Sequence, residues 1–176
     1  DISYDWIGVA PALNLDLSKV LFASMSGTAK SASFAPTETN NNTTWNLTLA
    51  GGTGFTATLS DNTLTLNDAV SVNVTSLGET ENYYSQLSAM LVNENGTVLA
   101  YGKVGEAIVG NVSFKLPSSI GKGSYTLKVF AEKVNSSASS NATDYASNMA
   151  SFTLNVVEAK NINLQINGDI AGITNP

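Results

Sequence analysis

The chain has 176 residues, of which 43% are hydrophobic and only 12% are charged, and its formal net charge is −6 at pH 7. It is long enough to bury a sizeable core. It contains no His and no Cys, and every basic residue is Lys, which excludes histidine bases, Cys–His pairs and zinc sites built on Cys or His. Binding of nucleic acid requires a basic face, so we expect no nucleic-acid partner.

Short polar residues dominate the rest of the composition. Ser, Thr and Asn are abundant, whereas Glu and Lys, which coat most helical cytosolic proteins, are scarce. Because their side chains bond the nearby backbone, Ser, Thr and Asn oppose helices and favour turns and exposed sheet faces. A surface of hydroxyls and amides is common in secreted and cell-wall proteins. We therefore expect an extracellular location, either secreted or at a cell surface.

Membrane insertion is not expected, because no stretch approaches the ~20 apolar residues of a membrane span. Neither end of the sequence has the features of a signal peptide or a sorting motif. The export signals of a secreted protein would therefore lie outside this sequence.

The first 60 residues contain three predicted strands, at residues 20–25, 45–49 and 55–59, and apolar and polar residues alternate in the last two. Such alternation predicts strands with one buried and one exposed face. The polar residues 27–44 predict a loop. We expect residues 1–60 to form an N-terminal β segment or small subdomain. It either stands beside the main domain or adds strands to it.

Residues 61–158 repeat the alternation in seven segments, near Leu64 and Val72 and at residues 87–92, 97–103, 112–116, 125–132 and 151–157. Turn sequences separate the segments, and no helix of more than two turns fits the pattern. The predicted fold class is all-β: an antiparallel immunoglobulin-like β-sandwich with the additional N-terminal β segment. Residues 159–176 read as a linker or a final strand.

Two local features of this domain are predicted in detail. Asn93-Glu94-Asn95-Gly96, between two alternating segments, predicts a hairpin, because Asn-Gly supplies the positive φ angles of a tight turn. Tyr125 follows a glycine-containing turn at the start of a strand. This position predicts a tyrosine corner, in which the hydroxyl anchors the preceding loop.

A candidate binding platform lies on the outer face of the sheet formed by residues 87–92, 97–103 and 125–132. Alternation places Met90, Tyr101 and Phe130 there, beside charged side chains such as Glu132. An exposed apolar patch marks a contact surface, and sugar rings could stack on Tyr101 and Phe130. The competing interpretation is that the N-terminal segment, with Trp6 or Trp45, covers this face.

The long connection from Asn135 to Asn148 is a second candidate. Loops of this length are often functional, and binding loops cluster at the ends of such sandwiches. Tyr145 would be its natural contact residue. Alternatively, Asp144 and Tyr145 fix the loop to the scaffold.

Carboxylates are the remaining acid–base groups, and none forms a convincing catalytic pair. Asp61 and Asp68 flank a predicted strand, and Glu79 and Glu81 lie in a polar turn. Neither pair has the setting of a glycosidase, so we interpret them as solvated turn charges. Asn93 to Gly96 lacks the spacing of a calcium loop. We expect no catalytic residue, no metal and no cofactor.

Two stretches resemble a known family of extracellular modules. Thr143-Asp144-Tyr145-Ala146-Ser147 resembles the TDYAS signature that closes immunoglobulin-like domains in large surface proteins of Gram-positive gut and rumen bacteria. Leu116-Pro117 and the segment 123–132 fit the same pattern. The resemblance covers most of the chain and is densest over residues 83–156. It implies a fold and an extracellular location rather than a chemistry.

The N-terminal stretch adds to this resemblance. Residues 8–15, GVAPALNL, together with Val20-Leu21-Phe22, resemble the GVRPALNL…VLFTS tail of a module similar to formylglycine-generating-enzyme or C-type-lectin-like folds. Ala10 replaces the usual Arg, and almost all of that upstream module is missing, so its activity is not carried over.

The expected function is that of a non-catalytic extracellular module of a bacterial surface protein, with a structural or adhesive, cell-adhesion-like role. Its expected partners are neighbouring domains of the same polypeptide and a host or cell-wall glycan or protein. The alternative is a carbohydrate-binding accessory module of a secreted enzyme.

Overall fold

The computed structural model describes residues 16–25, 33–37, 45–78, 84–134 and 144–158. Apart from one short 3-10 turn, η1 (Leu17–Lys19), every regular element in these ranges is a strand. The strands are β1 (Val20–Met25), β2 (Ala35–Pro36), β3 (Trp45–Gly52), β4 (Phe55–Leu59), β5 (Thr63–Thr65), β6 (Ala69–Leu77), β7 (Gln86–Val92), β8 (Val98–Gly105), β9 (Gly110–Lys115), β10 (Gly123–Lys133), β11 (Asp144–Ser147) and β12 (Ala150–Val157). In this part of the chain, no helix is long and apolar enough to cross a bilayer.

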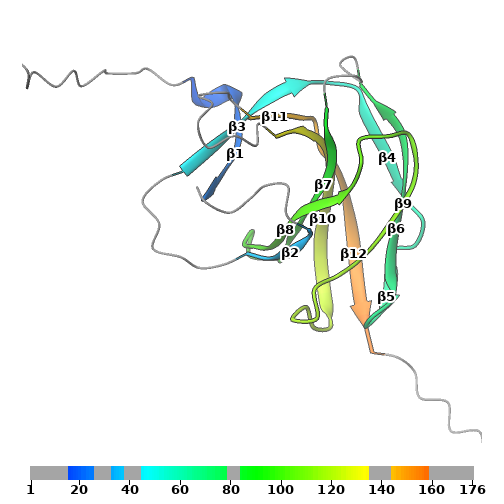
Figure 1. Cartoon of the computed structure of the whole chain (residues 1–176). Coiled ribbons are helices and arrows are strands. Elements are labelled where there is room, and N and C mark those ends of the chain that lie inside the picture. Colours follow the sequence, from blue (N-terminus) through cyan, green and yellow to red (C-terminus); the bar gives the residue numbers. More distant parts are fainter. Residues whose placement is uncertain (1–15, 26–32, 38–44, 79–83, 135–143, 159–176) are drawn as a thin grey trace, which may run out of the picture.

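The strands form two sheets that face each other (Figure 1). The smaller sheet has the order β4-β6-β9. The larger has nine strands in the order β1-β3-β11-β10-β7-β8-β2, with β12 beside β10 and β5 beside β12. Most neighbours are antiparallel, and the parallel pairs are β5 with β12 and β3 with β11. The all-β sandwich predicted from the sequence is confirmed.

The main core lies between the two sheets and follows the alternation of the strands. In β6, Val70, Val72 and Val74 are fully buried, and the residues between them are partly exposed. Leu127 and Val129 of β10 face them from the other sheet. Every second residue of a strand points to the same side, so each strand contributes one apolar row.

The predicted hairpin between β7 and β8 is confirmed. The side-chain Oδ1 of Asn93 accepts hydrogen bonds from the backbone N–H groups of Asn95 and Thr97, at 3.1 and 2.8 Å. Gly96 has a φ of +82°, the left-handed conformation that glycine adopts at little cost. The predicted tyrosine corner is also present, because the Tyr125 hydroxyl donates to the backbone oxygen of Gly121 at 3.0 Å.

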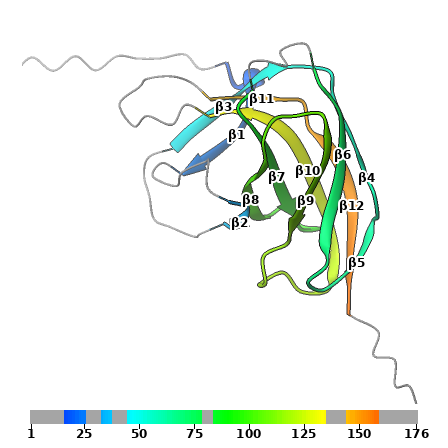
Figure 2. The same cartoon turned by 45° about the vertical axis from the view of Figure 1, so that its right-hand side comes forward.

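The strands before residue 60 are distributed over both sheets. β4 pairs with β6 and is an edge of the smaller sheet. β1 pairs with β3, which in turn pairs with β11, so these strands lengthen the larger sheet. Figure 2 shows how β1 and β3 lie at one end of the sandwich, beyond β10 and β7. Trp6, the side chain of Trp45 and the segment 159–176 lie outside the described residues.

Candidate functional site

The predicted apolar platform is buried, so its interpretation as an exposed binding surface is wrong. Phe130 is 0% exposed, Met90 is 8% exposed, and Tyr101 is partly buried. Phe22 of β1 lies against them, with its ring centre 5.5 Å from that of Tyr101 and 5.6 Å from that of Phe130. The competing interpretation was that the N-terminal segment covers this face. Phe22, in strand β1, provides that cover.

The physical reason is the curvature of the larger sheet. Two strands, β3 and β11, separate β1 from β10 in the sheet, yet Phe22 contacts Phe130. The sheet therefore curls until its outer face encloses a second apolar cluster. Its members are Met90, Phe130 and Ala146, with Phe22, Val92, Val98, Tyr101 and Met149 packed around them. We call this set the second cluster.

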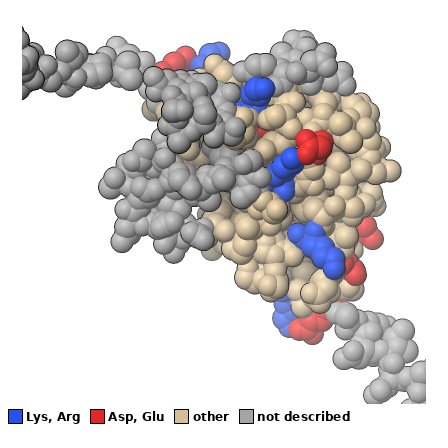
Figure 3. Space-filling model, in the orientation of Figure 1, with Lys and Arg blue, Asp and Glu red and all other residues tan. Residues whose placement is uncertain are grey.

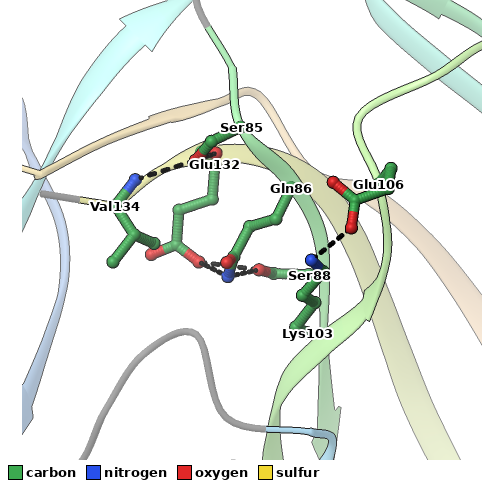
Figure 4. Close-up of polar contacts among 7 residues, drawn as sticks. All are labelled: Ser85, Gln86, Ser88, Lys103, Glu106, Glu132 and Val134. Carbon is green, nitrogen blue, oxygen red and sulfur yellow. Dashed lines mark hydrogen bonds and ion pairs between the residues drawn. The ribbon is translucent and has the colours of Figure 1, made fainter. Parts of the chain in front are cut away.

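A buried carboxylate lies beside the second cluster. Glu132 of β10 is 0% exposed. The Tyr101 hydroxyl lies 2.8 Å from each of its carboxylate oxygens, and the Ser88 hydroxyl donates to Oε2 at 2.7 Å. The Gln86 amide nitrogen lies 2.9 Å from the Ser88 Oγ and 3.5 Å from Oε2. Figure 4 shows Gln86, Ser88 and Glu132 converging from β7 and β10.

Strand register brings these groups together. Glu132 pairs with Gln86, and Phe130 pairs with Ser88, on neighbouring antiparallel strands. On the other side of β7, Tyr101 pairs with Met90. Side chains of paired and diagonal residues on one face lie within reach of each other, so β7 and β8 supply donors to a carboxylate on β10.

Sequence reasoning placed Glu132 on this outer face, beside the apolar patch, but gave it no role. The overlooked signal is the pair Gln86 and Ser88, two polar residues in a strand whose other members are nearly all apolar and buried. Polar groups buried in such a strand need partners. A polar pair at this spacing could have indicated an acceptor on the neighbouring strand.

The surroundings of Tyr101 keep its hydroxyl protonated. Burial, and then the charge and hydrogen bonding of Glu132, raise the pKa of the Tyr101 hydroxyl well above its ordinary value. The phenol therefore keeps its proton and remains a donor. Glu132 itself is fully buried in this arrangement. The cluster can fasten β7, β8 and β10 to one another.

Asp144 and Tyr145 lie in strand β11 rather than in a loop, which corrects the predicted loop position. β11 pairs antiparallel with β10 and parallel with β3. Asp144 is 8% exposed. The strand forms because both of its edges find partners, which the short, polar sequence did not indicate. Residues 135–143 of the predicted connection lie outside the described residues.

The end of β11 ties the two sheets together. The Ser147 hydroxyl donates to the Asn148 backbone oxygen at 2.8 Å and accepts from the Ala131 N–H at 3.0 Å. The Asn148 side chain accepts from the Phe55 N–H at 2.9 Å and donates to the Phe55 oxygen at 3.0 Å. These bonds connect β10 of the larger sheet with β4 of the smaller.

The two aspartates that flank β5 have the turn role predicted for them. The Asp61 Oδ1 accepts from the Thr63 N–H at 2.9 Å. The Asp68 Oδ2 accepts from the N–H and the hydroxyl of Thr65, at 3.0 and 2.5 Å. These hydrogen bonds hold the pKa of Asp68 below its ordinary value.

Asp68 borders a surface groove of about 320 Å³. Residues 65–68 form one wall, residues 116–121 form the other, and Val156 lies between them. Leu66 and Val156, which line the groove, lie where β5 and β12 end, and these two strands end on the same side of the sandwich (Figure 1). No set of three acidic side chains suited to a metal ion occurs among the residues described.

Charged side chains are sparse on the face shown in Figure 3, where a few acidic and basic groups, some of them side by side, lie on a mostly uncharged surface. In the part of the chain that the structure describes, Lys103 pairs with Glu106 and Lys122 pairs with Glu158, both at the surface. Exposed pairs of this kind contribute little to stability.

Comparison with known proteins gives no family for this chain and only a weak structural similarity. No family model matches the chain, and no curated protein matches it. One solved structure with some similarity is described as a putative bacterial DNA binding protein from Bacteroides vulgatus ATCC 8482. It shares 18% sequence identity at a TM-score of 0.34, over 57% of this chain and 42% of that one.

Proposed function

We propose that this chain is a non-catalytic structural and adhesive module of a bacterial surface protein, working outside the cell as one unit in a longer polypeptide. The observation that carries the proposal is the position of the first and last elements that the structure describes. η1 and the end of β12 lie at opposite ends of the sandwich (Figure 1). A module joined to its neighbours at opposite ends transmits tension along its length.

The last strand is held in a way that suits this role. β12 pairs with β10 through residues 150–156 on one side and with β5 through residues 155–157 on the other. The Leu66 N–H also donates to the Val157 oxygen at 3.0 Å. Tension at Glu158 runs along β12, so it loads these hydrogen bonds together rather than one after another.

The composition and the buried polar site support the same proposal. A surface of hydroxyls and amides fits an extracellular module, as does the resemblance to immunoglobulin-like domains of Gram-positive surface proteins. Glu132 fastens three strands from within. The alternative, a carbohydrate-binding accessory module, loses Tyr101 and Phe130 as a stacking surface because Phe22 lies over them.

Single-molecule force spectroscopy tests the proposal. The chain has no Cys, so Leu17→Cys with Glu158→Cys provides two handles at opposite ends. The control is Lys122→Cys with Glu158→Cys, since Lys122 and Glu158 are neighbours whose side chains lie 2.9 Å apart. Pulling on the control pair breaks the hydrogen bonds between β10 and β12 one after another. We expect a clearly higher unfolding force for the sandwich with the first pair, and equal forces would contradict the proposal.

A further inference from the structure

The groove between residues 65–68 and 116–121 combines an apolar floor with a polar rim. Val156 and Ile120, at 3% and 7% exposure, form the floor, and Leu66, at 36% exposure, lies at the edge. Asn67, Asp68, Ser118 and Ser119 line the groove and are exposed. Its volume of about 320 Å³ falls at the lower end of the range for small-molecule sites, roughly 300–1,000 Å³.

Asp68, at the rim of the groove, has a carboxylate oxygen that can accept hydrogen bonds from a ligand. Both hydrogen bonds to the Asp68 carboxylate reach Oδ2, and none reaches Oδ1 within the part of the chain that the structure describes. The bonds to Thr65 hold this carboxylate in place and lower its pKa, so it is ionised at neutral pH. A fixed, ionised acceptor binds hydroxyl donors more strongly than a neutral one does.

The backbone of Asn67 supports the same site. Its φ is +77°, and no other non-glycine residue in the described ranges has a positive φ. Asn tolerates this conformation better than most residues, but glycine adopts it at less cost. Asn67 combines this left-handed backbone with a side-chain amide at the rim of the groove, which glycine would lack.

The chemistry of the groove selects one class of ligand. The single carboxylate repels anions, and one carboxylate with neutral neighbours provides too little charge for a calcium site, which uses about 6–8 oxygen ligands. A ligand that suits both floor and rim has an apolar C–H face and several hydroxyl donors. We propose that this groove binds a sugar residue of a neutral saccharide. The inference rests on the proposed adhesive function, because it assumes that this surface meets glycans outside the cell.

Amide chemical shifts of the ¹⁵N-labelled chain test the inference. The probes are methyl glycosides of glucose, galactose, mannose and N-acetylglucosamine, and β-linked disaccharides of the same sugars. We expect at least one probe to shift the amides of residues 65–68 and 118–121 in a saturable way. If no probe shifts these amides, the inference is overturned, while the force experiment remains an independent test of the structural role.

Three variants make the test specific. Asn67→Gly relieves the positive φ and removes the side-chain amide, so it should fold at least as well as the parent and bind more weakly. Asp68→Asn should weaken binding by about tenfold, because it removes a charged acceptor. Asp61→Asn is the matched control, since Asp61 caps a turn at the other end of β5 but does not line the groove. Unchanged binding by Asp68→Asn and Asn67→Gly would overturn the inference.

Discussion

The Tyr101 hydroxyl lies 2.8 Å from both oxygens of the fully buried Glu132 carboxylate. The two residues belong to β8 and β10, which are separated by β7 in the sheet. Their contact crosses β7 on the face that Phe22 covers. Phe22 of β1 contacts the same Tyr101 ring, so the N-terminal strands pack against one member of this polar pair.

Removal of the Tyr101 hydroxyl should destabilise the protein. In Tyr101→Phe, Glu132 loses a donor while it stays buried, and such a loss costs about 1–3 kcal/mol. Unfolding in urea measures the free-energy change. The matched control is Tyr125→Phe, which removes the more exposed hydrogen bond to Gly121 and should cost less. If the two substitutions lower the free energy of unfolding equally, the buried hydrogen bond to Glu132 contributes no more stability than the exposed one to Gly121.

The raised pKa of Tyr101 predicts a specific loss of stability at high pH. In the unfolded chain the phenol deprotonates near its ordinary pKa of 10.0, whereas in the folded protein it keeps its proton well above that value. The contribution of this group is therefore complete below about pH 10 and is lost as the pH rises further.

The free energy of unfolding, measured from pH 9 upward, checks this sign. Above about pH 10 the parent should lose up to roughly 1.4 kcal/mol per pH unit more than Tyr101→Phe does, since one proton is involved. The other titrating groups are common to both proteins and cancel in the difference. Parallel pH profiles would contradict the raised pKa.

Truncation of Phe22 should expose the second cluster. Phe22→Ala removes the ring that contacts Tyr101 and Phe130, so we expect a loss of about 2–4 kcal/mol and stronger fluorescence of an apolar dye. Leu21→Ala is the control, because Leu21 is 39% exposed on the same strand, and it should cost less than about 1 kcal/mol. Unchanged dye binding by Phe22→Ala would mean that other residues cover the cluster.

Two glycines with positive φ should respond differently to alanine. Gly96 has open space around the position of a Cβ atom, so Gly96→Ala should cost about 1 kcal/mol from backbone conformation alone. At Gly78 a Cβ atom would also collide with the backbone oxygen of Thr53, so Gly78→Ala should cost clearly more. Thermal unfolding of both variants measures the difference, and equal melting temperatures would contradict it.

Local physics explains which predictions from sequence succeeded. Alternation of apolar and polar residues predicted β6, β7, β10 and β12, because the side-chain period of a strand is two whatever surrounds it. The hairpin at Asn93 to Gly96 and the corner at Tyr125 depend on residues close in the chain. β11 was missed because it is short and exists through pairing with β3 and β10.

The sequence by itself determined that this protein is an all-β sandwich, and which residues share each face of a strand. Only the tertiary structure decided what covers each face. Alternation placed Met90, Tyr101 and Phe130 together on an outer face, but their burial depends on Phe22, from a strand far earlier in the chain. Glu132, on the same face, is also fully buried. Burial is a property of the assembled sheets, because a strand's own sequence does not specify how far its sheet curls.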